Sequence, residues 1–249
     1  MSEGPQVRLR TEWLATHAAG REIIHARSSR PGLAEQCLSL AGRTIVRCFC
    51  KGKHIFIECS GDCYLHNHLL MRGKWRRYDG QQLLEPEQAW LSLYLGPYTL
   101  CNLNGQRLRV IDRPGVRKQL AALGPDVMST PYPRDEIRTA LRTSALPITE
   151  ALLRQGTVSG IGNVARSEAL FLAGIDPRLP ASDLTPAQSS ALLDALHQVM
   201  WDSYHTGGRW RHRVYHRTSL PCLRCGHPIR RVRLPPTRRN AYYCPVCQA

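Results

Sequence analysis

Residues 222–247 read CLRCGHPIRRVRLPPTRRNAYYCPVC, and this stretch decides how the C-terminal part of the chain folds. It opens with Cys222-Leu-Arg-Cys225 and closes, after eighteen residues, with Cys244-Pro-Val-Cys247. Two CxxC pairs at this spacing are typical of a zinc ribbon, in which two tight turns present four thiolates to one tetrahedral Zn²⁺. Disulfides and a redox dithiol are the alternatives, and the spacing favours one structural zinc ion.

The cysteine pairs lie in a strongly basic tail. Residues 209–249 contain ten arginines and no acidic residue. The whole chain of 249 residues has 34 Lys and Arg against 19 Asp and Glu, which gives a net charge of +15. With 43% hydrophobic residues, this composition predicts a folded basic protein and not a disordered polycation. Nucleic acid is the expected partner, with an anionic membrane surface as the alternative.

The hydrophobic pattern divides the rest of the chain into a strand-rich part and a helical part. Residues 4–17 have helical spacing, whereas short β-branched and aromatic runs alternate with turns from about residue 23 to 127. After Pro131-Tyr-Pro133 the spacing becomes helical. The strand-like runs are 45–49, 54–58, 63–66, 89–94 and 107–111, and the helical segments are 134–143, 148–155, 163–173 and 186–204.

We therefore expect an α+β multidomain chain. Its predicted parts are an N-terminal helix and β-sandwich (or flattened barrel) at 1–127, a linker at 128–133, a helical domain at 134–208 and a zinc ribbon at 209–249. Thr185-Pro-Ala-Gln188 is a capping box that predicts a helix start, and Gly174 predicts a helix end. No apolar run approaches the ~20 residues needed to cross a bilayer, so no membrane-spanning segment is expected, and nucleic acid rather than a membrane is the favoured partner.

Two glycines precede the predicted helix at 163–173. In Gly160-Ile-Gly162-Asn163 they would let the backbone approach a phosphate, and the helix that follows would direct its N–H groups and positive dipole end at that anion. The Asn163 amide would add a donor. The alternative is a glycine-rich helix connector. Beside an arginine-rich ribbon, we favour the phosphate-binding interpretation.

Several short stretches from one end of the chain to the other match a single family. They are Ser2-Glu3-Gly4-Pro5, Lys51-Gly52-Lys53-His54, His68-Leu-Leu-Met71-Arg-Gly73, Leu123-Gly-Pro-Asp-Val127, 155–175, 213–222 and 243–248. Together they resemble the formamidopyrimidine-DNA glycosylase/endonuclease VIII family, over the whole chain and in the same order.

The resemblance implies both a fold and an activity. The fold would be an N-terminal helix and β-sandwich, a helix–two-turn–helix domain and a C-terminal zinc finger with one structural Zn²⁺. The activity would be base excision repair by a bifunctional DNA glycosylase and abasic-site lyase. Its partner would be damaged double-stranded DNA, and the protein would be a monomer in the bacterial cytoplasm, associated with the nucleoid. Free thiols beside a zinc site also favour a reducing compartment.

By resemblance, the catalytic nucleophile is the α-amine of Ser2, exposed when the initiator Met is removed. An α-amine has a pKa near 7.7–8.0, so on the order of 10% is neutral at pH 7, against less than roughly 0.1% for a lysine. The neutral amine would attack C1′ and release the base. The protonated Schiff base that results would make the C2′ proton acidic enough for β-elimination.

The resemblance assigns roles to four more polar residues. Glu3 would be the general acid/base, and Lys53 would contact phosphate and aid proton transfer. Asn163 would hold the DNA backbone, and Arg239 would clamp the phosphates beside the lesion. Each has an alternative: Glu3 could complement a helix dipole, Lys53 could be an exposed turn lysine, and the adjacent Arg238 could be the clamp.

Substrate preference depends on two further features. Only five residues, 209–213, separate Gly207-Gly208 from Val214, too few for the loop that caps 8-oxoguanine in other members. The chain therefore resembles the endonuclease VIII branch, which favours oxidised pyrimidines. Met71 would fill the gap left by the flipped base, with a place in a strand core as the alternative. His66 and His68 share a strand face, so a second metal site is conceivable but not favoured.

Three positions depart from the family pattern. Ser2 replaces the usual proline, Gln6 replaces a glutamate expected beside the sugar, and Arg154 replaces an acidic residue. The first two motivate an alternative function, a catalytically weak or inactive lesion-binding protein with the same fold. A zinc-ribbon protein that acts on RNA is disfavoured, because nothing here offers an RNA-type stacking platform.

Overall fold

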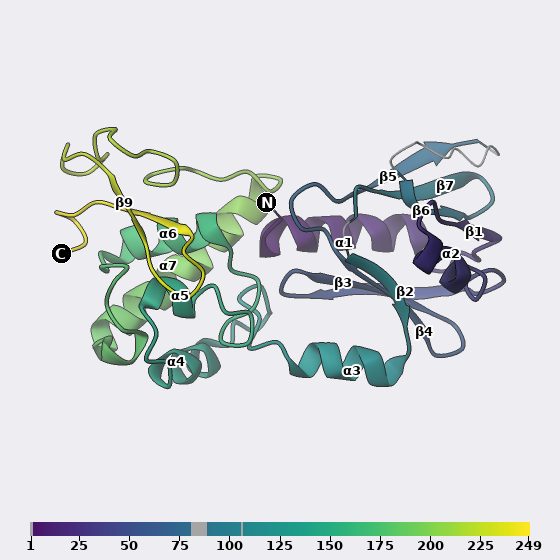
Figure 1. The fold of residues 1–249 in the computed structure, drawn as a ribbon, viewed down its shortest axis with the longest axis horizontal. Helices are drawn as coiled ribbons and strands as arrows, with labels where there is room; N and C mark the ends of the chain where they lie inside the picture. The colour runs from purple at the N-terminus through teal and green to yellow at the C-terminus, as the bar shows by residue number, and fades with distance from the viewer. Residues whose placement is uncertain (1, 81–88, 106) are drawn as a thin grey trace. The chain divides into compact units, whose positions relative to one another are not determined.

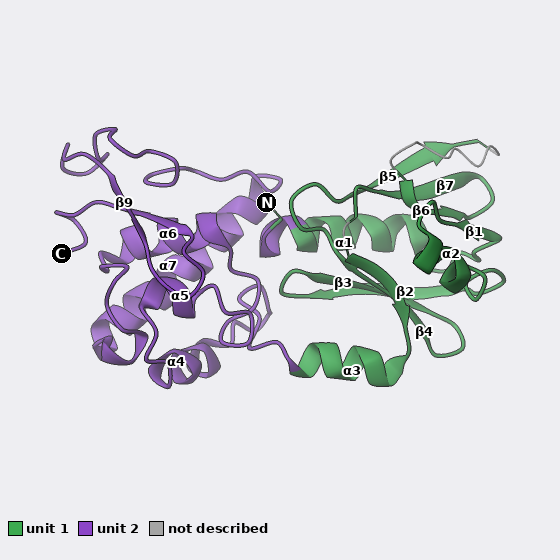
Figure 2. Ribbon diagram, viewed as in Figure 1, with its two compact units in different colours: residues 1–2, 7–121 green, residues 3–6, 122–249 purple. Residues whose placement is uncertain are grey.

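The computed structural model describes residues 2–80, 89–105 and 107–249 (Figure 1). Within them the chain divides into two compact units (Figure 2). The first unit holds Ser2 and 7–121, and the second holds 3–6 and 122–249. The helices and strands of the described chain, in order, are α1 (Gly4–Ala18), β1 (His25–Arg27), α2 (Pro31–Cys37), β2 (Ile45–Lys51), β3 (His54–Cys59), β4 (Cys63–His68), β5 (Lys74–Asp79), β6 (Ala89–Tyr94), β7 (Tyr98–Leu103), β8 (Arg107–Ile111), α3 (Arg113–Ala121), α4 (Arg134–Arg142), α5 (Ile148–Ala151), α6 (Asn163–Ala173), the 3₁₀-helix η1 (Ala181–Asp183), α7 (Pro186–His205), β9 (Arg230–Arg233) and β10 (Asn240–Tyr243).

The first unit contains two four-stranded antiparallel sheets, ordered β1-β6-β7-β5 and β2-β3-β4-β8. Side chains from both sheets and from α1 share one hydrophobic core, which includes Leu14, Ile57 and Leu93. The predicted β-sandwich with its N-terminal helix is therefore confirmed, and so are the five predicted strand runs.

The sequence pattern missed five elements of this unit: the helices α2 and α3 and the strands β1, β5 and β7. Helix α2 begins with Pro31-Gly32 and buries only Leu33 and Cys37, and α3 buries only Val116. Such short helices present too few apolar residues to produce a detectable helical period, and propensity is a weak guide at this length.

The second unit is helical and includes the C-terminal tail. Helices α6 and α7 pack around a core that contains Leu170 and Leu196. The capping box of α7 is confirmed, since Thr185 Oγ1 accepts from Gln188 N at 3.2 Å and Gln188 Oε1 accepts from Thr185 N at 3.0 Å. Gly174 ends α6 with a φ of 69°.

The division between the units falls at Ala121/Ala122, before the linker expected at 128–133. Val127 and Met128 are buried in the core of the second unit, so the chain here is already packed. The tail belongs to this same unit, because its two-stranded β9–β10 hairpin packs against α6. Among the described residues, none of the helices has the length and hydropathy needed to span a bilayer.

Candidate active site and metal centre

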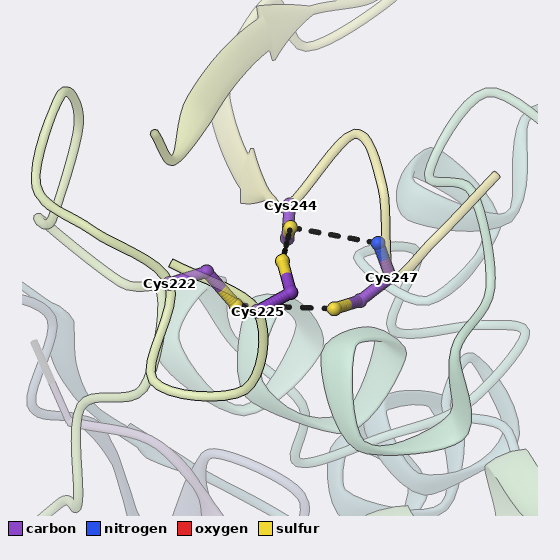
Figure 3. Close-up of side chains that lie close together, drawn as sticks. All are labelled: Cys222, Cys225, Cys244 and Cys247. Atoms are coloured by element: carbon purple, nitrogen blue, oxygen red, sulfur yellow. Dashed lines mark hydrogen bonds between the residues drawn. The ribbon is translucent and has the colours of Figure 1, made fainter. Parts of the chain in front are cut away.

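The four tail cysteines meet at one point (Figure 3). Their Sγ atoms all lie within 4.8 Å of one another, with Cys225 and Cys244 at 3.5 Å and Cys222 and Cys247 at 3.9 Å. A tetrahedral ZnS₄ centre with Zn–S near 2.3 Å requires S···S distances of about 3.8 Å, so these residues fit one zinc ion. Four thiolates fill the coordination shell and leave no position for a catalytic water, which makes the site structural.

No second metal site is found in the described part of the chain, where the cysteine cluster is the one group with suitable spacing. The two histidines considered for such a site, His66 and His68, have other partners. His66 Nε2 lies 2.8 Å from His54 Nδ1, and His68 Nδ1 accepts from Leu70 N at 3.0 Å.

Polar contacts fix the zinc ribbon to the C-terminal end of α6. Gln248 is fully buried; its Oε1 accepts from Cys244 N at 2.9 Å and its Nε2 donates to Ile175 O at 2.8 Å. The Arg224 guanidinium donates to Phe171 O at 3.1 Å and to Leu172 O at 3.2 Å. The cation therefore donates to carbonyls of the last helical turn, of which Phe171 O also accepts from Gly174 N at 3.2 Å.

The β9–β10 turn that carries Arg239 is held by a buried carboxylate that sequence reasoning did not single out. Glu150 accepts from Thr237 N and from Thr237 Oγ1, each at 3.0 Å, and Thr237 Oγ1 in turn accepts from Arg239 N at 3.3 Å. The Glu150 and Arg166 side chains are both fully buried, with 3.7 Å between Oε1 and Nη1. Burial lowers the pKa of Arg166 to about 10, and the charge of Glu150 opposes that shift.

Asn163 contacts the same hairpin. Its Nδ2 donates to Asn240 O at 3.1 Å, and its Oδ1 accepts from the Arg166 guanidinium. Arg166 also donates to Asn240 O at 2.7 Å. The structure thus brings Asn163 and the turn of Arg239 together, and the Arg239 side chain is exposed to solvent. An amide nitrogen has two hydrogens, so Asn163 retains a second donor for a ligand.

The N-terminus of α6 binds an anion, but that anion is the protein's own Glu3. The buried Glu3 carboxylate accepts from Gly162 N at 3.0 Å, Val164 N at 2.9 Å and Ala165 N at 3.2 Å. The expectation that these N–H groups receive a phosphate is therefore corrected. Gly162 is needed because a Cβ there would lie 2.3 Å from Glu3 Cδ.

Gln6 supports the same segment through both ends of its amide. Its Oε1 accepts from Glu3 N at 3.0 Å, and its Nε2 donates to Gly208 O at 2.5 Å and lies 3.4 Å from Ser203 Oγ. Beside Ser203, the end of α7 and the short segment 209–213 line a cavity of about 430 Å³.

Ser2 lies beside the turn that carries Met71. The Ser2 backbone nitrogen donates to Leu70 O at 3.1 Å, and Leu70 has a φ of 49°. Met71 lies outside the strands and is 62% exposed, which excludes the strand-core alternative. In the first unit, therefore, the amine position and an exposed apolar side chain are adjacent.

Lys53 is only 8% exposed, so the alternative of an exposed turn lysine is wrong. Its charge acts on His54 and His68, two of three histidines on β3 and β4. Burial, together with neighbouring charged groups, lowers the pKa of His54 and His68 to about 4 and that of His66 to about 3. Arg109 Nε donates to His66 Nδ1 at 3.2 Å, so His66 carries its proton on Nε2 and donates it to His54.

Models of known families match almost the whole chain. Residues 1–115 match the formamidopyrimidine-DNA glycosylase N-terminal domain, 123–212 the formamidopyrimidine-DNA glycosylase H2TH domain, and 219–249 the zinc finger found in FPG and IleRS. The chain belongs to the formamidopyrimidine-DNA glycosylase family.

Individual relatives cover the chain from end to end. It is 32% identical over 270 residues to a protein named probable endonuclease 8 2 from Streptomyces coelicolor, across 100% of this chain and 94% of the relative. It is 27% identical to endonuclease 8 from Klebsiella pneumoniae, across 100% of both. Among solved structures, Lactococcus lactis Fpg in complex with DNA that contains an abasic site has a TM-score of 0.87 and 26% identity, across 99% of both chains.

Proposed function

We propose that this member of the family is a base excision repair glycosylase and abasic-site lyase, with the α-amine of Ser2 as its nucleophile. Family membership over the whole chain supports the class of reaction. The observation that carries the assignment is the Ser2–Leu70 contact, which holds the amine position beside the exposed Met71. A nucleophile there would meet C1′ of a nucleotide whose base has left the stack and been replaced by Met71.

The reaction follows from a neutral α-amine at pH 7. The Ser2 nitrogen attacks C1′, the C1′–N bond to the base breaks, and the base leaves with a proton from the site. The C1′–O4′ bond then opens as the ring oxygen takes a proton, and the nitrogen forms a protonated Schiff base with C1′. Loss of a proton from C2′ breaks the 3′ C–O bond by β-elimination, and water hydrolyses the Schiff base to release the enzyme. Glu3 is the proposed general acid/base and Lys53 the proposed cation beside the phosphate and the transferring proton.

The DNA backbone would be bound by the second unit's zinc-supported hairpin. Arg239 is exposed on a turn fixed by Glu150, and Asn163 retains a donor beside it. Both would contact phosphates and would therefore position the duplex without reading its sequence. The five-residue segment 209–213 leaves no capping loop, which supports oxidised pyrimidines as substrates. The protein would act on chromosomal DNA in the cytoplasm, in association with the nucleoid.

The second candidate is a lesion-binding protein with the same fold and little chemistry. Two observations favour it: the primary amine of Ser2 in place of the family's proline, and Gln6 in place of a carboxylate. It shares the hairpin, the zinc ion and the DNA contacts, so only a chemical readout separates the two candidates.

Borohydride trapping tests the nucleophile directly. Reduction in the presence of an abasic duplex should attach DNA covalently to a peptide that begins at Ser2, and intact mass should show that the initiator Met is absent. A variant with an extra residue before Ser2 is the control and should give no adduct. Binding without any adduct, strand cleavage or base release from oxidised-pyrimidine, 8-oxoguanine and abasic duplexes would establish the binding protein instead.

A further inference from the structure

Two cysteines face each other across the β3–β4 hairpin, outside the proposed catalytic machinery. Cys59 ends β3, Cys63 begins β4, and the two residues are directly paired in the antiparallel ladder. The turn between them has positive φ at Gly61 (73°) and Asp62 (57°). Opposed residues in such a ladder have Cα atoms about 4.5–5.5 Å apart. That spacing lies within the ~4.4–6.8 Å range that disulfides span.

The two thiols differ in their access to solvent. Both residues are buried, with 2% of Cys59 and 5% of Cys63 exposed. Cys63 nevertheless lines a surface cavity of about 500 Å³, together with Arg43 and Asp62, and Cys59 is not among the residues that line it. A small molecule entering this cavity would therefore meet Cys63, with Cys59 behind it.

The electrostatics favour a thiolate at Cys63. A hydrogen bond from the Cys59 thiol and the charge of Arg43 lower the pKa of Cys63 to about 7, against burial and Asp62, which raise it. The same hydrogen bond and burial raise the pKa of Cys59. The titratable and charged groups around the pair are Cys59 on β3, Cys48 on β2, Arg43 before β2, Asp62 in the turn, and Asp112 and Arg113 after β8.

We propose that Cys63 and Cys59 form a peroxide-reactive thiol pair that closes to an intramolecular disulfide. The Cys63 thiolate attacks one oxygen of hydrogen peroxide, an S–O bond forms, the O–O bond breaks and hydroxide leaves. Cys59 then loses its proton and attacks the Cys63 sulfur, an S–S bond forms, the S–O bond breaks and water leaves. Two thiols are oxidised by two electrons in total, and one peroxide is reduced to two molecules of water.

Other cysteines of the chain lack this combination. Burial raises the pKa of Cys37 to about 11 and that of Cys48 to about 12, so both stay protonated at neutral pH. Neither lines the cavity. The zinc thiolates are held by the metal and form a separate target, which the experiment must distinguish. Neither Cys59 nor Cys63 is among the residues assigned to catalysis or DNA binding.

Peptide mapping of the zinc-loaded protein tests the pair. Trypsin releases residues 54–72 as one peptide, which contains Cys59 and Cys63 and no other cysteine. After brief treatment with stoichiometric hydrogen peroxide and blocking of free thiols, this peptide should lack two hydrogen atoms and carry no blocking group. Cleavage before Asp62 should then yield two peptides joined through sulfur. The rate of formation should rise as the pH passes through about 7.

Two variants assign the order of events. Cys59→Ser should leave a sulfenic acid at Cys63 that dimedone captures, whereas Cys63→Ser should leave Cys59 reduced. Cys37→Ser is the matched control and should behave as wild type. A wild-type protein whose zinc cysteines oxidise while peptide 54–72 stays reduced would overturn the proposal. So would a disulfide from Cys63 to Cys48 or Cys50, seen as peptide 54–72 joined to 48–51, which contains both. Both outcomes are read on wild-type protein, so a variant that fails to fold cannot obscure the result.

Discussion

Replacing Gly162 with alanine should dislodge Glu3 from the N-terminus of α6. Gly162 has φ −122° and ψ −161°, which any L-residue adopts, so the backbone itself tolerates the change. The new Cβ would lie 2.3 Å from Glu3 Cδ and 2.5 Å from both Cγ and Oε1. Contacts this short cannot persist, and the carboxylate must leave its three N–H donors.

The expected loss of stability is about 3–5 kcal/mol. Overpacking a buried site costs about 1–3 kcal/mol, and a lost hydrogen bond to a charged group costs about 1.5–3 kcal/mol. Water that reaches the freed N–H groups would offset part of the loss of the other two bonds. For a chain of this size, each kcal/mol lowers Tm by about 2–4 °C. Base removal should also fall if Glu3 transfers the proton.

Gly156→Ala is the matched control. It lies in the same connection, and a Cβ there would meet only Ala122 O at 3.4 Å, an ordinary contact. Thermal unfolding of both zinc-loaded variants should therefore separate them clearly. On a Glu3→Ala background the Gly162→Ala change should cost much less, because the clashing atoms are gone. Equal melting temperatures for Gly162→Ala and Gly156→Ala, with base removal intact, would refute the reasoning.

Three further predictions concern DNA binding, the hairpin and pH. Arg239→Ala should weaken binding to damaged and undamaged duplexes alike and reduce the slope of log K against log salt concentration by about one. Arg238→Ala is the control, and an equal loss of affinity in both variants would contradict the assignment of Arg239 as the phosphate clamp. Glu150→Gln should lower the free energy of unfolding by about 3 kcal/mol, because Arg166 stays buried without its counter-charge, and should weaken DNA binding. Unchanged unfolding would show that the Glu150–Arg166 pair does not stabilise the fold. The folded-state pKa values of His54, His66 and His68 lie below the ordinary value of about 6.5. Below that pH the unfolded chain therefore binds more protons than the folded chain. The contribution of these histidines to stability should be complete above pH ~6.5 and decrease as the pH drops toward 4. His66→Gln should reduce this loss of stability at low pH, which is measured as the free energy of unfolding at a series of pH values.

The sequence was sufficient to predict features that depend on residues close together in the chain. Each CxxC spacing predicts a tight turn, and a set of four thiolates predicts that the two turns meet around one metal ion, as they do here. The capping box at Thr185 and the glycine stop at Gly174 also act within a few residues. These features depend on neighbours in the chain, so one sequence carries the necessary information.

The long-range hydrogen-bond partners of buried polar side chains could not be predicted from the sequence. Glu150 lies 87 residues from Thr237, and Glu3 lies 159 residues from Gly162, so no spacing links them. The glycines before α6 predicted a phosphate, but the pattern could not reveal that the chain supplies its own anion. A free phosphate and an internal carboxylate satisfy helix N–H groups in the same way.

The structure also bears on whether the departures from the family weaken the chemistry. Gln6 uses its amide as a donor to Gly208 O and as an acceptor from Glu3 N. A glutamate would place a carboxylate oxygen against the Gly208 carbonyl oxygen, which repels it. The glutamine is therefore matched to this chain's own backbone, and it fixes the peptide unit of Glu3. Of the two changes that motivated a binding protein, only the primary amine of Ser2 then remains. A primary amine still forms a Schiff base, and that imine needs only a proton to promote β-elimination. The contacts of Gln6 therefore favour the enzyme over the binding protein.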